Sequence, residues 1–222
     1  MKNLPIYDVL DDIKTTLNTE SALILEAPPG AGKSTVVPIS LLNESWLENK
    51  VIIMLEPRRV AVRMVAVQMA KLLGEEVGQS VGYQVKMESC YSKQTKLLVV
   101  TEAILVRKLQ SDQALEDVAM VIFDEFHERS IHTDLSLALC LQVQELLRPD
   151  LKLLIMSATL DSNELTNLLG DIPVINSKGK IYDVENIYLE TNIKQPDIKS
   201  INTLLLNITL KAIKEDEGDI LV

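Results

Sequence analysis

The 222-residue chain has only two cysteines and no long apolar segment. Cys90 and Cys140 lie far apart and outside any Cys-x-x-Cys or Cys/His spacing, so the sequence predicts neither a disulfide framework nor a zinc site. The longest apolar run, Val118 to Phe123, is far shorter than the roughly 18 to 20 residues of a membrane-spanning helix. Met1 to Lys14 also lacks the basic and apolar regions of a signal peptide. We expect no membrane span and a reducing, cytoplasmic location.

The chain also lacks an excess of positive charge. It has 22 basic and 32 acidic residues and a net charge of -10. This balance argues against nucleic-acid binding through the overall field, but it is compatible with a few arginines in one cleft. The hydrophobic fraction of 47% and the charged fraction of 24% are typical of a globular protein and exclude a disordered or collagen-like chain.

Short apolar runs alternate with stretches of helical periodicity along most of the chain. Such runs, without polar alternation, are typical of strands buried on both faces of a parallel sheet. The sequence therefore predicts a doubly wound, mostly parallel α/β fold that binds ligands at the carboxyl ends of its strands. The expected strands are Ala22 to Leu25, Val51 to Leu55, Leu97 to Val100, Met120 to Phe123 and Leu151 to Met156. Val60 to Leu73 and Asp134 to Leu147 are expected to be helices.

After Gly170 the pattern changes to shorter pieces. Pro173 to Ile175 and Val184 to Leu189 have the composition of strands, and a helix is expected from about Ile198 to Lys214. Asp219 to Val222 is predicted to begin another strand. We therefore expect a domain boundary and a chain that is a fragment of a longer protein.

A glycine-containing loop follows the first expected strand. Its sequence at 27–35 is Ala-Pro-Pro-Gly-Ala-Gly-Lys-Ser-Thr, which differs from the phosphate-loop consensus only in having Ala27 for the first glycine. Small residues let backbone N–H groups converge on phosphate oxygens, while Lys33 would contact the β and γ phosphates and Ser34 would ligate Mg²⁺. The alternative is a turn that binds nothing. The predicted nucleotide-binding residues are Pro29, Gly30, Ala31, Gly32, Lys33, Ser34 and Thr35.

Two adjacent carboxylates follow the expected strand Met120 to Phe123. Holding Asp124 and Glu125 together is costly unless a cation or a proton-transfer task requires them. We predict that Asp124 and Glu125 belong to a magnesium site with Ser34, and that Glu125 activates the attacking water as a general base. A different metal site with Asp124 and His127 as ligands is the competing interpretation, although no second histidine has a useful spacing.

Five ordered blocks together resemble superfamily 2 helicases of the DEAH-box type, and most closely the bacterial HrpB family. The blocks are Ala-Pro-Pro-Gly-Ala-Gly-Lys-Ser at 27–34, Leu-Glu-Pro-Arg-Arg at 55–59, Thr-Glu at 101–102, Asp-Glu-Phe-His-Glu-Arg-Ser at 124–130 and Met-Ser-Ala-Thr-Leu at 156–160. Phe126 departs from the DEAH name but looks like the HrpB form, and Ala103 stands where many relatives have glycine.

The resemblance implies roles for residues outside the phosphate loop. Arg58 and Arg59 would grip the phosphates of a single strand, and Thr101 and Glu102 resemble a second motif that grips the nucleic-acid backbone. Taken alone, the arginines read as surface charges, and Thr101 and Glu102 as an ordinary helix start. Ser157, Ala158 and Thr159 resemble the motif that couples hydrolysis to strand movement, and a helix cap at Ser157 or Thr159 is compatible with it. His127 would join the catalytic group and bridge toward this motif; a buried structural histidine is the alternative.

The resemblance further implies a RecA-like P-loop NTPase fold and an N-terminal motor domain over 1–175. Residues 176–222 would hold a linker, a helix and the first strand of a truncated second RecA-like domain. The expected cofactors are ATP and Mg²⁺, and the expected partner is single-stranded nucleic acid, RNA in preference to DNA. An ATP-switched scaffold that acts through an unidentified protein partner is the alternative from a different class. A small-molecule P-loop kinase is a third, less favoured interpretation, because it assigns no function to the Pro-Arg-Arg and Ser-Ala-Thr blocks.

Overall fold

The computed structural model describes residues 4–158, 169–170, 172–179, 185–188, 197–215 and 218–221. The chain divides into two compact units, Met1–Lys180 and Ile181–Val222, which are described separately. No helix within these described residues is long and apolar enough to cross a membrane.

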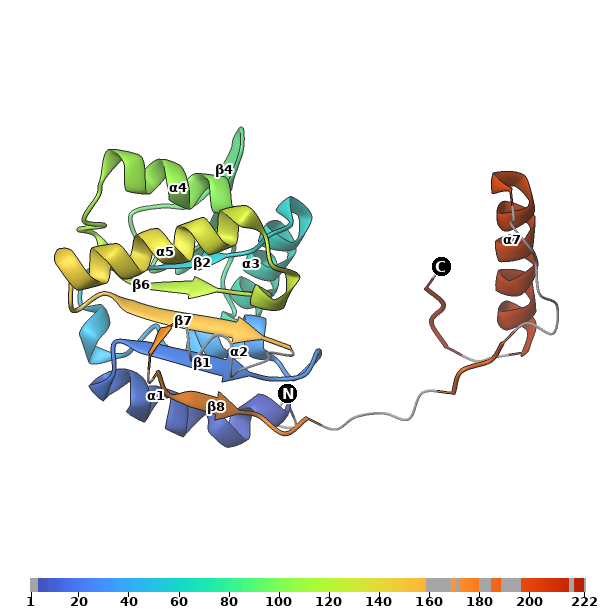
Figure 1. The fold of residues 1–222 in the computed structure, drawn as a ribbon, viewed down its shortest axis with the longest axis horizontal. Coiled ribbons are helices and arrows are strands. Elements are labelled where there is room, and N and C mark those ends of the chain that lie inside the picture. The colour runs from blue at the N-terminus through green and yellow to red at the C-terminus, as the bar shows by residue number, and fades with distance from the viewer. Residues whose placement is uncertain are drawn as a thin grey trace. The chain divides into compact units, whose positions relative to one another are not determined.

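The first unit alternates strands and helices along the chain (Figure 1). Its first half contains η1 (Pro5–Val9), α1 (Leu10–Thr19), β1 (Ala22–Glu26), α2 (Lys33–Ser40), η2 (Ser45–Leu47), β2 (Val51–Leu55), α3 (Arg59–Leu73), β3 (Val81–Val85) and β4 (Glu88–Cys90). Its second half contains β5 (Leu97–Val100), α4 (Glu102–Ser111), β6 (Val118–Phe123), η3 (Phe126–Glu128), α5 (Ile131–Leu146), β7 (Lys152–Ser157) and β8 (Val174–Asn176).

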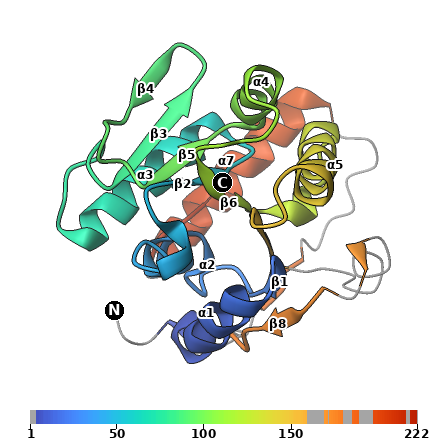
Figure 2. The same cartoon turned by 90° about the vertical axis from the view of Figure 1, so that its left-hand side faces the viewer.

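One sheet of eight strands organises this unit, in the order β4-β3-β5-β2-β6-β7-β1-β8. All neighbouring strands run parallel except β3 and β4, which form an antiparallel pair. Figure 2 shows α1, α2 and α3 on one face of the sheet and α4 and α5 on the other. The predicted doubly wound, mostly parallel fold is therefore confirmed.

Alternate residues of the central strands feed two separate cores, one on each face of the sheet. In β6, Met120 and Ile122 join the core with α1, α2 and α3, whereas Val121 and Phe123 join the core with α4 and α5. All six residues of β6 are buried. This two-sided burial explains why the strand sequence is continuously apolar.

The five predicted strands are confirmed, with ends that differ by at most two residues. Helix α3 ends at Leu73 as predicted, because Gly74 adopts a φ of 74° and caps it. Helix α5 begins at Ile131, three residues before the prediction, because the Ser130 hydroxyl accepts a hydrogen bond from the Thr133 amide and caps the helix.

Strands β3 and β4 were not predicted. Strand β4 is the edge of the sheet and is mostly exposed, whereas β3 lies between β4 and β5 and is mostly buried. The sequence Val-Gly-Tyr-Gln-Val of β3 contains a glycine and a glutamine, so it is not a continuous apolar run. Arg59 on α3 donates a hydrogen bond to the Lys86 carbonyl at the turn of this hairpin, with an N–O distance of 3.1 Å. The hairpin therefore contacts the start of α3.

The second unit contains α7 (Ile198–Glu215), which confirms the predicted helix. Asp197 caps it by accepting a hydrogen bond from the Ser200 amide at 2.8 Å. Within the predicted strand Val184 to Leu189, residues 185–188 are described and are not a strand. Residues 219–221, predicted to begin a strand, are not one either. A strand needs a hydrogen-bonded neighbour, and the described residues provide none to these two segments.

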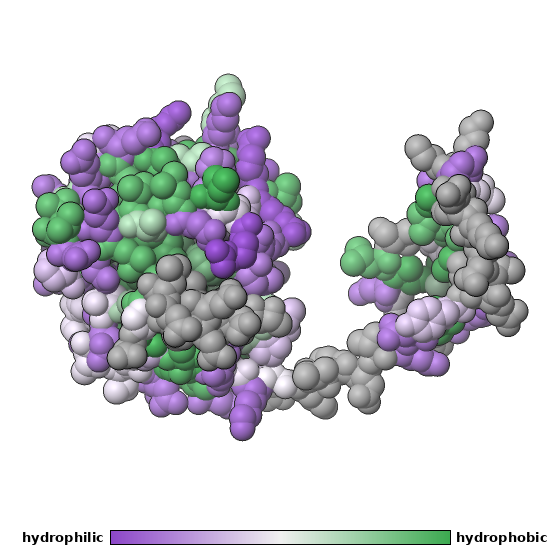
Figure 3. All heavy atoms as spheres, in the orientation of Figure 1, coloured by the Kyte–Doolittle hydropathy of each residue, from purple (hydrophilic) through white to green (hydrophobic). Residues whose placement is uncertain are grey.

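Apolar side chains are exposed on α4 and α5 of the first unit (Figure 3). Leu135, Leu146 and Leu147 are each about half exposed or more. Together with residues of α4 such as Val106 and Leu109 they line a groove of about 500 Å³. This groove is apolar, unlike the edge of the sheet that carries the sequence motifs.

Candidate active site

The sheet brings the five sequence motifs to one edge. The blocks that begin near residues 27, 55, 101, 124 and 156 follow or end β1, β2, β5, β6 and β7. These five strands are parallel and lie next to one another in the sheet. Their carboxyl ends therefore meet at a single edge, which is where doubly wound folds bind ligands.

The loop after β1 owes its shape to two glycines. Gly30 and Gly32 have φ values of 76° and 97°, in the left-handed region that favours glycine. A Cβ on Gly32 would also lie 3.0 Å from a side-chain carbon of Leu4 and 3.1 Å from one of Ile6. The Ile6 amide donates a hydrogen bond to the Ala31 carbonyl at 3.2 Å, so the N-terminal segment holds the loop in place.

Lys33 connects this loop to the carboxylate pair after β6. It is the first residue of α2, and its side chain is only 5% exposed. Its ammonium donates a hydrogen bond to Glu125 Oε1 at 3.0 Å. The structure therefore brings together the predicted phosphate-contacting lysine and the predicted general base, which are 92 residues apart in the sequence.

Asp124 lies beneath this pair and is 3% exposed. Its Oδ1 accepts a hydrogen bond from the Glu125 amide at 2.8 Å, whereas its buried Oδ2 has no hydrogen-bond partner among the described residues. Burial raises the pKa of the Asp124 carboxyl, and the Ser34 hydroxyl and the Lys33 charge partly oppose the increase. A buried, unpartnered carboxylate oxygen beside a serine hydroxyl and a second carboxylate is a donor set that fits Mg²⁺.

Glu125 itself has a strained backbone. It adopts a φ of 48°, and Arg129, four residues later, adopts 44°. Positive φ values are uncommon for residues with a Cβ and cluster at functional sites. The segment from Glu125 to Arg129 is thus held in a conformation that its sequence alone does not favour.

Glu56 is a site residue that the sequence reasoning missed. It is 4% exposed, and it follows Leu55, which pairs with Phe123 in the β2–β6 register, so Glu56 and Asp124 are neighbours. Burial, followed by the charge of Asp124 and a hydrogen bond with it, raises the pKa of Glu56 to about 8. The signal that could have found it was a glutamate directly after a buried strand, one strand away from Asp124.

His127 lies between the carboxylates and the strand β7. Its Nε2 is 3.4 Å from Glu125 Oε2, and its Nδ1 accepts a hydrogen bond from the Ala158 amide at 3.4 Å. An Nδ1 that accepts places the proton on Nε2, facing Glu125. Neither nitrogen is then left for a metal ion, which does not favour the interpretation of Asp124 and His127 as metal ligands.

The end of β7 also contacts the phosphate loop. The Ala27 amide donates a hydrogen bond to the carbonyl of the buried Ser157 at 3.0 Å. The block at 156–160 therefore touches the phosphate loop through Ser157 and the catalytic histidine candidate through Ala158. Thr159, the third predicted coupling residue, lies outside the described residues.

The predicted nucleic-acid residues differ in their surroundings. The Arg58 side chain is 73% exposed and forms an ion pair with Glu128 at 2.7 Å. Thr101 precedes α4 as its N-cap and makes no side-chain capping bond. The Glu102 Oε1 accepts a hydrogen bond from the Ser130 hydroxyl at 2.7 Å and another from the Thr133 hydroxyl. Arg58 is thus exposed and Thr101 is partly exposed, whereas the Glu102 carboxylate accepts hydrogen bonds from α5 and its N-cap.

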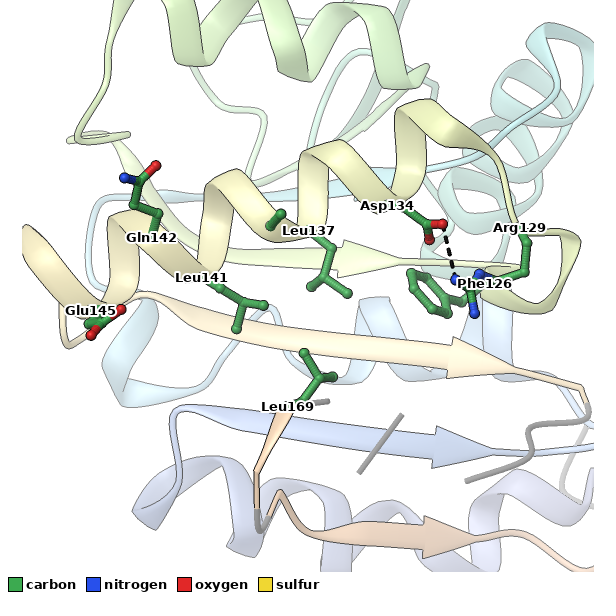
Figure 4. A pocket seen from close by; sticks show the side chains of 9 residues that line it. Phe126, Arg129, Asp134, Leu137, Leu141, Gln142, Glu145 and Leu169 are labelled. Atoms are coloured by element: carbon green, nitrogen blue, oxygen red, sulfur yellow. Dashed lines mark hydrogen bonds and ion pairs between the residues drawn. The ribbon is translucent and has the colours of Figure 1, made fainter. Parts of the chain in front are cut away.

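Phe126, the departure from the DEAH name, is an anchor of the core. It is 2% exposed and packs edge-to-face against Phe123, with ring centroids 6.5 Å apart. Figure 4 shows Arg129 beside the Phe126 ring and paired with Asp134 at one end of a pocket of about 470 Å³. An aromatic ring here fixes the loop after Asp124 and Glu125 to the sheet.

A model of the DEAD/DEAH box helicase family matches residues 11–168. The chain belongs to the DEAD/DEAH box helicase family. It is 44% identical over 222 residues to the ATP-dependent RNA helicase HrpB of Escherichia coli (strain K12), covering 100% of this chain and 27% of that protein. It is 32% identical to the ATP-dependent RNA helicase HrpA of Borreliella burgdorferi, covering 99% of this chain and 26% of that protein.

Solved structures agree with this membership. The crystal structure of the Escherichia coli DEAH/RHA helicase HrpB matches with a TM-score of 0.88 and 44% identity, covering 98% of this chain and 27% of that one. A second crystal structure, of the E. coli DExH-box NTPase HrpB, matches with a TM-score of 0.82. The predicted family resemblance and the RecA-like fold are confirmed. This helicase-family chain spans about a quarter of the length of these relatives.

Proposed function

We propose that the chain is the ATP-binding and hydrolysing part of a helicase that couples Mg-ATP hydrolysis to movement along single-stranded RNA. The observation that carries the proposal is the 3.0 Å contact between Lys33 and Glu125 above the buried Asp124. It brings together a phosphate-loop lysine and a candidate general base from the segments that follow two different strands, β1 and β6. The relatives are described as ATP-dependent RNA helicases, which supports the choice of nucleotide and of strand.

The residues of the site divide the chemical work. The backbone of residues 29–35 and the Lys33 ammonium bind the phosphates of ATP, so Lys33 must exchange Glu125 for phosphate oxygens. Asp124 and the Ser34 hydroxyl would hold Mg²⁺, which when bound neutralises charge that develops on the phosphates. Glu125, once released from Lys33, orients the attacking water and accepts its proton.

His127 connects this chemistry to the rest of the domain. Its Nε2 faces Glu125, and its Nδ1 accepts from the Ala158 amide. A shift of Glu125 on nucleotide binding therefore changes the contact between Glu125 Oε2 and the His127 imidazole. Through Ser157 and Ala158 the change reaches the end of β7, which supports the coupling role proposed for these residues and for Thr159.

RNA binding is assigned to the accessible cations at the same edge. Arg58 is exposed, and its partner Glu128 is itself partly exposed, so a phosphate can replace this pairing at small cost. Arg59 makes one hydrogen bond to the Lys86 carbonyl and is also exposed. Thr101 adds a hydroxyl that makes no capping bond. These few groups account for RNA binding by a chain with a net charge of -10.

The proposal places this chain at the N-terminal end of a longer cytoplasmic protein. Residues 176–222 would hold the linker, a helix and the start of a second RecA-like domain, which would supply arginine fingers. An arginine finger contributes about 10³ to 10⁵ to the rate in related phosphoryl-transfer enzymes. The 222-residue chain alone is therefore expected to bind ATP but to hydrolyse it very slowly.

Steady-state hydrolysis of Mg-ATP, with and without single-stranded RNA, tests the proposal. The isolated chain should turn over very slowly without RNA stimulation, whereas the full-length protein should be stimulated. In the full-length protein Glu125→Gln should keep ATP binding and lose turnover, and Glu145→Gln, an exposed change on α5, should behave as wild type. Turnover that survives in Glu125→Gln would remove Glu125 from the role of general base.

A further inference from the structure

Glu102 joins the loop assigned to RNA binding to the loop assigned to ATP hydrolysis. We propose that Glu102 is a positioning residue that couples these two loops through Ser130 and Thr133, rather than a group that grips the nucleic-acid backbone. The inference rests on the function proposed above, because it concerns how the two ligands of that function influence each other. It also gives Glu102 a role different from the one that the family resemblance implies.

The contacts form a closed arrangement at the start of α5. Glu102 Oε1 accepts from the Ser130 hydroxyl at 2.7 Å and from the Thr133 hydroxyl. The Thr133 amide donates to the same Ser130 oxygen at 3.0 Å. Each hydroxyl has one proton, and both protons are directed to Glu102, so the Ser130 lone pair is free to cap the helix. A single carboxylate oxygen thus accepts from the hydroxyls of both Ser130 and Thr133 at the first turn of α5.

On the RNA side, Glu102 is the first residue of α4. The residue before it, Thr101, is the N-cap of that helix, and its backbone carbonyl accepts a hydrogen bond from the Ile104 amide at 2.9 Å. A displacement of the first turn of α5 is therefore passed to Thr101 through one side chain. A carboxylate is repelled by phosphate and attracts hydroxyl donors, so its chemistry suits the contact with α5 better than direct contact with an RNA backbone.

On the ATP side, Ser130 ends the segment that begins at Glu125. Glu125 and Arg129 both have positive φ values in the present structure, in which Glu125 is bound to Lys33. When Lys33 binds a phosphate of ATP in place of Glu125, Glu125 loses its ion-pair partner and the strained segment is free to change its conformation. The far end of the segment is Ser130, which is fixed to Glu102. ATP binding and the position of Thr101 are linked by this path.

The test measures coupling rather than activity. In the full-length protein, the affinity for a fluorescein-labelled oligouridylate is measured by anisotropy with Mg-ADP and with Mg-ADP plus beryllium fluoride. The ratio of the two dissociation constants is the coupling factor. Glu102→Gln and Thr133→Val remove the charge and one donor, respectively, at nearly unchanged volume. Thr133→Ser, which keeps the hydroxyl, and Glu145→Gln are the matched controls.

Allosteric coupling factors are typically about 5 to 150. We expect Glu102→Gln and Thr133→Val each to reduce the wild-type factor toward 1, by about threefold or more. The double variant should lose no more than the larger single loss, because both act through one contact. Thr133→Ser and Glu145→Gln should keep the wild-type factor. Nucleotide affinity without RNA and the melting temperature of each variant show that it is folded.

Three results would overturn the inference in distinguishable ways. An unchanged coupling factor in Glu102→Gln and Thr133→Val would remove the path while leaving the helicase proposal intact. An equal loss of RNA affinity in both nucleotide states would make Glu102 a direct or purely structural contributor to RNA binding. If the wild-type protein binds no oligouridylate in either state, the proposed function itself fails, and the inference fails with it.

Discussion

Replacing Glu56 with glutamine is expected to change how the stability of the chain depends on pH. In the folded chain burial and Asp124 raise the pKa of Glu56 from 4.5 to about 8. The folded state therefore binds a proton that the unfolded state releases between these two values. By proton linkage, the free energy of unfolding falls as pH rises from 4.5 to about 8. Glutamine is neutral throughout and can still donate a hydrogen bond to Asp124, so this decline should largely disappear.

The magnitude follows from the size of the shift. A shift of one pKa unit corresponds to about 1.4 kcal/mol, so the change from 4.5 to about 8 gives a ceiling of about 5 kcal/mol. Because Glu56 and Asp124 share their burial and repulsion, we expect about 2 to 4 kcal/mol of this difference to appear. Glu56→Gln should thus match wild type near the bottom of the pH window and be more stable near its top.

Urea unfolding of the isolated chain at several pH values between 4.5 and 8, with EDTA present to remove divalent cations, measures this difference. Glu145→Gln, an exposed glutamate on α5, is the control and should follow the wild-type curve. Some decline should persist in Glu56→Gln, since burial also raises the pKa of Asp124. Parallel curves for wild type and Glu56→Gln would refute the reasoning, because they would show that Glu56 is ionised in the folded chain.

Three further predictions concern arginine side chains. The double variant Arg58→Ala/Arg59→Ala should weaken binding of single-stranded RNA by the full-length protein. It should also lower the slope of log affinity against log salt concentration by about 0.7 per lost phosphate contact. An unchanged slope would show that the RNA phosphates bind elsewhere. Arg148 donates to three backbone carbonyls and pairs with Asp150, so Arg148→Ala should destabilise the chain by about 3 kcal/mol in urea melts. Arg148 also lowers the pKa of Asp150 from its ordinary value of 3.8, so the pair stabilises the fold above pH 3.8 and this stabilisation is lost as pH falls below it. In Arg148→Ala the free energy of unfolding should therefore fall less steeply toward low pH. An equally steep fall in Arg148→Ala and wild type would contradict the pairing.

The central sheet could be predicted because its strands are buried on both faces. Runs such as Val118 to Phe123 have no polar alternation, and each motif begins where such a run ends. The hairpin of β3 and β4 has no comparable signal, because a glycine and a glutamine interrupt β3 and the edge strand β4 is short and mostly exposed. Terminal segments were harder still: the predicted strand at 219–222 depends on a partner strand that the described residues do not contain.

Within the site, the sequence located the motifs but not the contacts between them. Glu56 carries no local sign of burial in the sequence, and only the register of β2 with β6 places it beside Asp124. Likewise, the resemblance grouped Glu102 with Thr101, whereas the contact of Glu102 with Ser130 joins residues 28 positions apart. Such relations depend on strand order and helix packing, which local sequence patterns do not encode.

The most direct test of the account is a calorimetric titration of the chain with Mg-ADP and Mg-ATP. Lys33 binds the phosphates in this account, so the wild-type chain should bind both nucleotides and Lys33→Ala should lose tight binding. A cooperative melting transition of Lys33→Ala shows that the variant is folded. Lys71→Ala, an exposed lysine on α3, should bind as wild type does. Equal nucleotide affinity in Lys33→Ala and wild type would contradict the assignment of the loop at 27–35 as the phosphate site, and with it the proposed function.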